Sequence, residues 1–220
     1  RDWSSDVCSS DLIGRLKGAT IVYVNSKELR EGVKRELQKL GADKNFYEIQ
    51  GPELFGLLGK EAEAVVWADV DTLLHLPDFR APEKIVWTIQ KLGRLAKGNL
   101  YLQTSSPDHP LFQDLSRENL PRFYHRELRN RQELSFPPFS TLVKLSFTAK
   151  SSAKVNFEAE KLSEELTAFE VSPPYPPYST TPGKVQLNLA LKLKNPGELA
   201  KISQRISPDW KIEVNPESLL

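Results

Sequence analysis

The chain has 220 residues, with 30 lysines and arginines against 29 aspartates and glutamates, and its formal net charge is +1. This balance excludes recognition of nucleic acid through overall charge alone, and no apolar run approaches the roughly 20 residues that a membrane span needs. Cys8 is the only cysteine, so this chain cannot form an internal disulfide or a cysteine zinc site. Such cysteine usage fits a cytoplasmic location.

The first twelve residues, RDWSSDVCSSDL, do not resemble a folded segment. They are rich in serine and aspartate, and they show no periodicity that continues into the following sequence. They resemble the translation of a common sequencing-adapter oligonucleotide, and the alternative is a natural flexible tail. We therefore set residues 1–12 aside as an expected artefact, begin the fold prediction at residue 13, and expect the natural protein to extend upstream.

Residues 13–133 alternate between strand and helix patterns. Runs of β-branched and aromatic residues predict strands, and apolar residues at helical spacing predict helices. The alternation favours a parallel α/β layer, because buried parallel strands are apolar on both faces. The predicted strands are residues 19–25, 46–49, 63–70 and 99–104, and the predicted helices are residues 26–41, 52–59, 82–95 and a basic stretch at 110–133.

The pattern changes after the PPF sequence at Pro137–Phe139, so we place a domain boundary at residues 134–138. Strict alternation in VQLNLALKLK predicts a half-buried strand, and the whole segment favours a compact α+β domain at residues 134–220. The predicted strands are residues 141–149, 185–194 and 210–215, and the predicted helices are residues 154–169 and 196–206.

The segment ADVDTLLHLPDFRAPEK, residues 68–84, is the most specific motif in the chain. Asp69 and Asp71 follow a predicted strand, and Asp78 and Arg80 lie in the loop beyond them. Carboxyl ends of parallel strands are where α/β sheets place ligand sites. The alternative is that these carboxylates only cap the next helix.

This segment resembles the second motor lobe of the primosomal replication-restart helicases, the primosomal protein N′ family, where a DxD, a Leu-Leu and a PDFR sequence follow in this order. LYLQTSSPDHPLF, the passage from Tyr124 to Phe139 and the ending VNPESLL resemble later parts of the same family. The resemblance covers about residues 65–220. It implies a partial RecA-like second helicase lobe at residues 13–133 and a C-terminal DNA-binding α+β domain at residues 134–220.

The chain departs from the family at the motor's interlobe nucleotide motif, where Gln90, Gly93 and Arg94 persist but Lys97 replaces the last arginine. A lysine cannot bind phosphate bidentately as an arginine does. ATP and magnesium are implied for the full-length parent, but no phosphate-binding GxxxxGK[ST] loop occurs here. We therefore expect the fragment alone to bind no nucleotide and to be inactive. The zinc-binding insertion of the family is not present, and the three histidines lack metal-ligand spacing.

Two basic segments are candidates for binding DNA. In the first, Arg122, Arg126 and Arg129 lie close to aromatic residues, a combination that suits single-stranded DNA. The alternative is a solvated helix face whose arginines pair with neighbouring glutamates. In the second, Tyr175, Tyr178 and Lys184 belong to the proline-rich loop PPYPPYSTTPGK. The resemblance implies DNA contact there, and the alternative is a proline-stiffened connection between strands.

The resemblance implies that the parent protein binds stalled forks and single-stranded DNA and helps to reload the replicative helicase, with ATP-driven unwinding if its motor is intact. The implied partners are DNA, a single-stranded DNA-binding protein and other primosome proteins; we expect a monomer with no membrane association. The alternative is a degenerate, non-hydrolysing DNA- or protein-interaction module. A third interpretation, an RNA-binding α+β domain with an accessory lobe, conflicts with the PDFR and PESLL segments.

Overall fold

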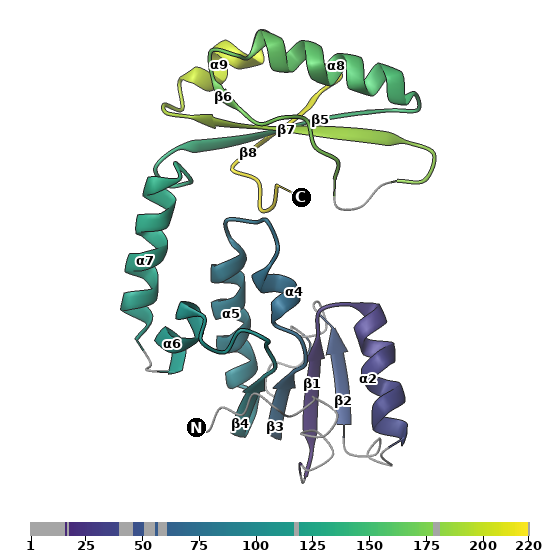
Figure 1. The fold of residues 1–220 in the computed structure, drawn as a ribbon, viewed down its shortest axis with the longest axis vertical. Helices are drawn as coiled ribbons and strands as arrows, with labels where there is room; N and C mark the ends of the chain where they lie inside the picture. Colours follow the sequence, from purple (N-terminus) through teal and green to yellow (C-terminus); the bar gives the residue numbers. More distant parts are fainter. Residues whose placement is uncertain are drawn as a thin grey trace. The chain divides into compact units, whose positions relative to one another are not determined.

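The computed structural model divides the chain into two units (Figure 1). The first comprises residues 1–76 with 81–120, and the second comprises residues 77–80 with 121–220. The artefact expected at residues 1–12 lies outside the described part of the chain. The structure describes residues 16, 18–39, 46–50, 56, 61–116, 119–177 and 181–219.

The first unit contains a four-stranded parallel sheet in the order β2-β1-β3-β4. Its strands are β1 (Thr20–Val24), β2 (Phe46–Gln50), β3 (Ala62–Trp67) and β4 (Ala96–Leu102). Its helices are α2 (Lys27–Lys39), α4 (Asp71–Leu74), α5 (Ala81–Gly93) and α6 (Pro110–Ser116). Helix α2 connects β1 to β2, and α5 lies between β3 and β4, as parallel strands require.

The core of the first unit explains why these segments fold as they do. All five residues of β1 are buried, as expected for a central parallel strand. Val33 and Leu37, one helical turn apart on α2, pack in one apolar cluster with Val22 and Val66. Each such fully buried side chain contributes about 2 kcal/mol to folding through loss of apolar surface from water.

The two tryptophans in the described part of this unit differ in burial. Trp67 is fully buried at the end of β3, as its apolar run predicts. Trp87, which also lies in an apolar run and is therefore expected in the core, is 43% exposed, so that expectation from the sequence is wrong. Successive helical residues turn by about 100°, so Trp87 lies about 200° around α5 from the buried Ile85.

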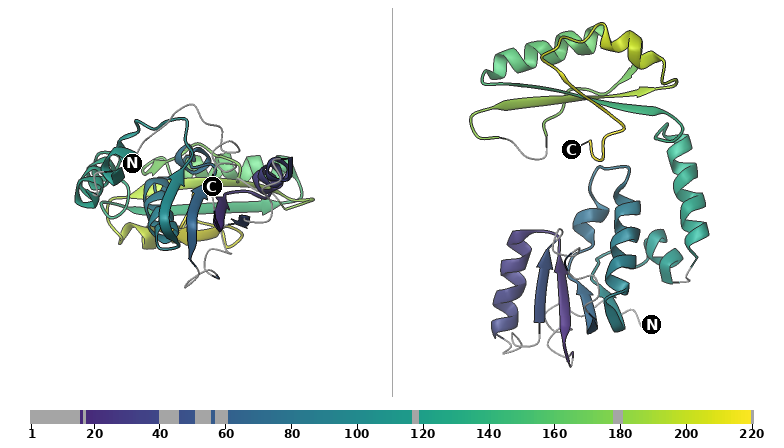
Figure 2. Two further views of the ribbon diagram at one scale, coloured as in Figure 1. Left: turned by 90° about the horizontal axis from the view of Figure 1, so that it is seen from below. Right: turned by 180° about the vertical axis from the view of Figure 1, so that it is seen from behind.

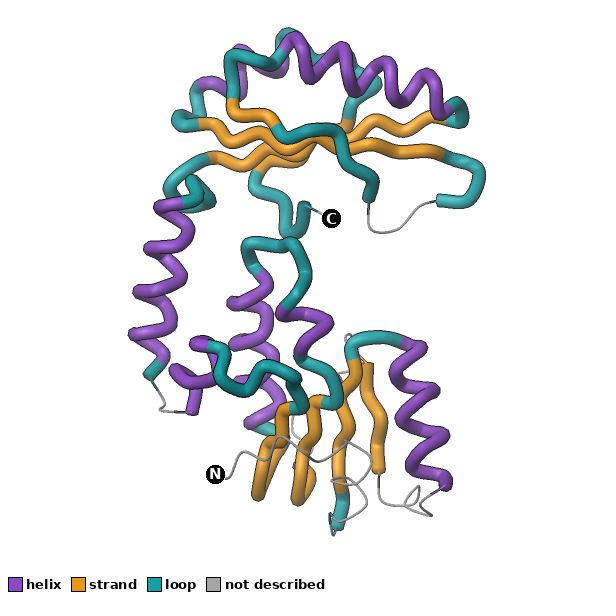
Figure 3. The backbone as a smooth tube through the Cα atoms, viewed as in Figure 1, coloured by secondary structure: helices purple, strands orange, loops and turns teal. Residues whose placement is uncertain are grey.

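The second unit contains a four-stranded antiparallel sheet in the order β6-β7-β5-β8. Helices α8 and α9 lie over one face of this sheet, as Figures 2 and 3 show. Its strands are β5 (Thr141–Ala149), β6 (Glu170–Val171), β7 (Val185–Leu193) and β8 (Lys211–Val214). Its helices are α7 (Leu120–Glu133), α8 (Ser152–Glu165) and α9 (Glu198–Ser203).

Alternation along the strands produces the second core. Val143, Leu145 and Phe147 of β5 share one apolar cluster with alternate residues of β7 and with the buried side of α8. Helix α8 begins at Ser152 because the side chain of Ser151 caps it, accepting a hydrogen bond from the Lys154 amide at 3.3 Å. The sequence placed this start two residues later.

The predicted fold class, a parallel α/β layer followed by a small α+β domain, is confirmed. The predicted helix at residues 52–59 lies outside the described residues except for Gly56. The domain limits 13–133 and 134–220 stay a prediction; in the structure, residues 77–80 and all of α7 beyond Leu120 group with the second unit. In the described part of the chain, no helix is long and apolar enough to cross a membrane.

Candidate nucleic-acid interface

Helix α7 presents three arginines on one face. Arg122, Arg126 and Arg129 are spaced by four and three residues, so they align along the helix. Arg122 and Arg129 are exposed and Arg126 is half-buried. Phe123, only 1% exposed, lies on the buried side and anchors the helix, which directs the three arginines away from the core.

Glu127 forms an ion pair on the buried side of α7. The Glu127 carboxylate is buried and accepts a hydrogen bond from Arg131 Nε at 2.8 Å. Residues 120–133 contain four arginines and two glutamates, so the helix has a formal charge of +2 with histidine neutral. The alternative in which arginines pair with neighbouring glutamates therefore holds for Arg131 and Glu127, which form a buried ion pair.

The aromatic residues near the arginines do not share their face. The Phe123 ring is buried and contacts the Tyr124 ring edge-on, with centroids 5.1 Å apart. Tyr124 is 45% exposed but lies about 160° around the helix from Arg126. The exposed arginines are therefore suited to binding phosphates. No exposed aromatic ring of α7 lies beside them on which a base could stack.

The carboxyl edge of the parallel sheet brings Asp71 to the loop that follows β4. Its carboxylate accepts hydrogen bonds from the Ser105 amide and hydroxyl, both at 2.6 Å, and from the Thr104 hydroxyl. Partial burial raises the pKa of Asp71, but these hydrogen bonds and nearby His75 outweigh it and hold the pKa below its usual value. Asp71 therefore joins the ends of two neighbouring strands.

Asp69 has a helix-capping geometry. Its carboxylate accepts hydrogen bonds from the Thr72 amide at 3.1 Å and from the Thr72 hydroxyl. Its carbonyl accepts a hydrogen bond from the Asn25 side chain, whose oxygen in turn accepts one from Trp67 Nε1 at 3.2 Å. The helix-capping alternative thus describes Asp69, whereas the buried Gln103 Oε1 at the same edge accepts no hydrogen bond from any described residue.

The PDFR segment belongs to the second unit. Asp78 is buried and accepts a hydrogen bond from the Arg80 amide at 2.9 Å, which forms a tight turn. The turn presents Phe79, whose ring stacks on Phe136 with centroids 4.9 Å apart and planes inclined by 5°. The guanidinium groups of Arg80 and Arg131 lie 5.3 and 5.1 Å from the Phe79 ring centroid.

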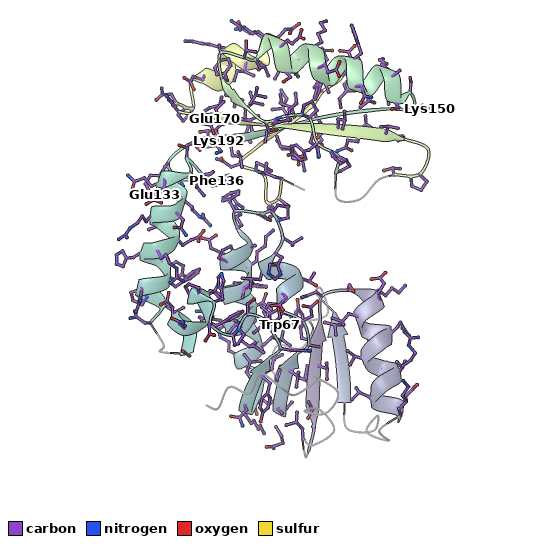
Figure 4. All side chains as sticks on the ribbon, in the orientation of Figure 1. Trp67, Glu133, Phe136, Lys150, Glu170 and Lys192 are labelled. Carbon is purple, nitrogen blue, oxygen red and sulfur yellow. The ribbon has the colours of Figure 1, made fainter. Side chains whose placement is uncertain are left out.

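The stack continues into the antiparallel sheet. Lys192 Nζ lies 4.6 Å from the Phe136 ring centroid, pairs with Glu170 at 3.0 Å, and donates a hydrogen bond to the Leu134 carbonyl at 2.8 Å. Figure 4 shows Phe136, Lys192 and Glu170 close together where α7 leads into the sheet. These contacts hold the turn that contains Asp78 and Arg80 against the second unit.

The residues of the nucleotide motif lie at the other edge of the parallel sheet. Gln90, Gly93 and Arg94 are exposed at or just beyond the end of α5. Lys97, at the start of β4, pairs with Glu61 at 3.1 Å, and both side chains are more than half exposed. Because β3 and β4 are parallel, this pair and Asp71 lie at opposite ends of the same strands.

The proline-rich loop contributes one structural tyrosine. Tyr175 forms backbone hydrogen bonds with Asn188, and its hydroxyl donates to the Leu219 carbonyl at 2.9 Å. Burial raises the pKa of Tyr175 to about 12, so the hydroxyl stays protonated. Lys184 is exposed at a turn, and Tyr178 lies outside the described residues.

Sequence reasoning missed a set of buried polar residues on β5 and β7. Lys144, Ser146 and Asn188 are each less than 8% exposed. The available signal was the strict alternation of TLVKLSFTA, which assigns Lys144 and Ser146 to the face opposite the apolar core. Alternation does not reveal whether that second face is solvated or covered. In the described part of the chain, no group of three histidine, cysteine or acidic side chains could hold a metal ion.

These features define a two-unit protein in which a parallel α/β unit is followed by a basic helix and an antiparallel α+β unit. Its sequence is similar to replication restart proteins named PriA: 27% identical over 161 residues in Bacillus subtilis (strain 168), 36% over 106 residues in Treponema pallidum, and 29% over 139 residues in Haemophilus influenzae. These matches cover 68%, 46% and 58% of this chain. The predicted resemblance to primosomal replication-restart proteins is thereby confirmed.

The similarity concerns a part of those relatives. The chain spans about a fifth or less of their length: 20% in Bacillus subtilis, 16% in Treponema pallidum and 19% in Haemophilus influenzae. No family model matches the chain.

Proposed function

We propose that this chain is part of a replication-restart protein, and that the arginine face of α7 binds the sugar–phosphate backbone of DNA. The similarity to several proteins named for replication restart supports the first part. The alignment of Arg122, Arg126 and Arg129 on one face of α7 supports the second part, and it is the observation on which the proposal depends.

The physical basis is electrostatic. Each arginine that neutralises a phosphate releases condensed counterions, and this release supplies most of the sequence-independent affinity for nucleic acid. Guanidinium groups also bind phosphate oxygens in a bidentate manner. Since exposed aromatics do not share this face, we expect the contacts to be with the backbone and to occur on both single-stranded and forked DNA.

The finer assignments are proposed from the resemblance. They are recognition of stalled forks, help in reloading the replicative helicase, action together with a single-stranded DNA-binding protein and other primosome proteins, and use of ATP and magnesium by the full-length parent. The residues proposed to face nucleotide and DNA in that parent are Gln90 and Arg94, with Lys97 in place of the terminal arginine.

The test is fluorescence anisotropy of the chain with labelled single-stranded and forked DNA at low salt. Replacing Arg122, Arg126 and Arg129 together by alanine should weaken binding about tenfold or more, because three phosphate contacts are lost. The control removes the same charge from other exposed positions of the second unit, Lys150, Lys161 and Lys201, and should leave affinity nearly unchanged. Equal losses in both variants would show only a non-specific charge effect, and no binding by the original chain would favour the protein-interaction alternative.

A further inference from the structure

A stack of aromatic rings and cations lies where the loop at residues 77–80 meets the antiparallel sheet. The Phe79 and Phe136 rings are nearly parallel, with centroids 4.9 Å apart. The Arg80 guanidinium lies 5.3 Å from the Phe79 centroid, and Lys192 Nζ lies 4.6 Å from the Phe136 centroid, so each ring has a cation beside it. We name these four residues the ring stack. Because Lys192 belongs to β7, the ring stack fixes the loop to the sheet.

Helix α7 is held to the ring stack through Arg131. The Arg131 guanidinium lies 5.1 Å from the Phe79 ring centroid. Its Nε donates a hydrogen bond to the Glu127 carboxylate at 2.8 Å, and a terminal nitrogen donates to the Pro137 carbonyl at 3.4 Å. These partners belong to the loop, to α7 itself and to the segment that follows α7. Phe79 is therefore one of the groups that hold the C-terminal end of α7 in place.

The segment that connects α7 to β5 also depends on these contacts. Ser135 has a φ of 51°, a left-handed conformation that costs free energy for a residue other than glycine and persists only where its surroundings hold it. The Phe136 amide donates to the Arg131 carbonyl at 2.7 Å, and Lys192 Nζ donates to the Leu134 carbonyl at 2.8 Å. Members of the ring stack thus flank the strained residue on both sides and favour one direction for α7.

We infer that Phe79 is a positioning residue for the arginine face of α7. By holding Arg131 it fixes the direction of the helix, and Arg129 and Arg126 lie only two and five residues earlier on that helix. The three arginines of the face then meet the phosphate backbone together instead of one at a time. This inference rests on the proposed DNA-binding function, but Phe79 itself contacts no DNA in it.

The place of Phe79 in the chain extends this role. The loop at residues 77–80 lies between α4 and α5 of the first unit, yet it groups with the second unit. Arg80 alone separates Phe79 from Ala81, the buried first residue of α5. The loop is therefore a covalent link between the first unit and the contacts that set the direction of α7.

A double-mutant cycle separates positioning from stability alone. It measures the anisotropy of a labelled oligodeoxythymidine of roughly 16 nucleotides at low salt. The four forms are the original chain, Phe79→Ala, the variant with alanine at Arg122, Arg126 and Arg129, and the combination. Phe79→Ala should weaken binding about fivefold in the original chain, because a smaller fraction of molecules holds the face aligned. It should change binding less than about 1.5-fold in the arginine variant, where no face remains to be positioned.

Two further variants give the matched comparison. Phe79→Tyr keeps the stacked ring and should restore binding to within about 1.5-fold of the original chain. Phe157→Ala, at an exposed position of α8, should leave binding unchanged. If Phe79→Ala loses its circular dichroism, Phe79→Leu takes its place, because leucine keeps apolar bulk and removes the ring.

The direction of α7 can also be measured without DNA. Spin labels are placed on cysteines at the exposed positions His125 of α7 and Glu160 of α8, with Cys8 replaced by serine. Pulsed electron resonance should give one narrow distance distribution for the original chain and for Phe79→Tyr. The distribution should broaden in Phe79→Ala, because the end of α7 has lost one of its contacts.

An equal loss of affinity in both arms of the cycle would overturn the inference, since the effect would not pass through the arginines. An unchanged distance distribution in Phe79→Ala would overturn it as well, whether or not the original chain binds DNA. If the arginine variant binds as tightly as the original chain while the distribution broadens in Phe79→Ala, the DNA-binding proposal fails and the positioning of α7 by Phe79 stands.

Discussion

Asp71 shows how one carboxylate can join two elements that are distant in sequence. It follows β3, and its hydrogen-bond donors Thr104 and Ser105 follow β4. The sequence correctly placed Asp71 at the carboxyl edge of a parallel sheet, where ligand sites are common. Its partners could not be predicted, because threonine and serine in a loop have no distinctive spacing relative to a carboxylate more than thirty residues earlier.

Replacing Asp71 by asparagine should lower the free energy of unfolding by about 1 kcal/mol at pH 7. This is below the usual range for hydrogen bonds to a charged group, because solvent screens the partly exposed carboxylate. The folded-state pKa lies below the unfolded value of about 3.9, so the contribution is present above that value and is lost as pH falls through the folded-state pKa. Urea unfolding at pH 7 measures stability with the carboxylate ionised, and urea unfolding near pH 2 measures it with the carboxyl group protonated.

The matched control is Asp108→Asn, since Asp108 is exposed and acts in the described hydrogen bonds only through its backbone carbonyl. It should change stability by less than about 0.5 kcal/mol at either pH. If Asp71→Asn destabilised the chain as much near pH 2 as at pH 7, the ionised carboxylate would not be the stabilising group.

At the scale of elements, the loop at residues 77–80 is built into the second unit by Phe79. Its ring stacks on Phe136, which in turn lies beside Lys192. The sequence identified PDFR as a motif but assigned it to the first lobe, because neighbours along the chain are strands and helices of that lobe. A contact between residues 79 and 136 spans 57 positions, and periodicity contains no information about it.

Phe79→Ala should weaken the second unit and spare the first. Loss of the stacked pair and of its partly buried surface should cost about 2 kcal/mol. Hydrogen exchange measured by mass spectrometry reports the two units separately: amides of β5 that open with the whole unit should exchange about 30-fold faster, and those of β1 should not change. Phe157→Ala, at a position 64% exposed on α8, is the control and should alter neither. Faster exchange in β1 alone would contradict this assignment of the loop.

At the scale of the whole molecule, the sequence predicted element types well, because apolar residues recur about every 3.6 residues in a helix and every 2 residues in a half-buried strand. Strict alternation located β5 to its exact ends, and unbroken apolar runs located β1 and β3. Helical spacing was less decisive for α7, whose basic stretch with α6 was predicted as one segment. Two short elements, α4 and β6, were missed because four and two residues are too few to show any period.

The net charge of the whole chain and the local charge of α7 lead to different expectations about DNA binding. A net charge of +1 over 220 residues gives no long-range attraction to DNA, but α7 alone has a formal charge of +2. The sequence predicted the arginines of this surface, and the i,i+4 spacing of Glu127 and Arg131 agrees with the buried pair that they form. The proposed interaction is therefore local and should depend on specific arginines.

The salt dependence of DNA binding tests this account most directly. The logarithm of the association constant is measured against the logarithm of salt concentration for the original chain and for the variant lacking Arg122, Arg126 and Arg129. Loss of three phosphate contacts should reduce the slope by about 2 for single-stranded DNA. Identical slopes, or no binding by the original chain at low salt, would contradict a nucleic-acid interface on α7.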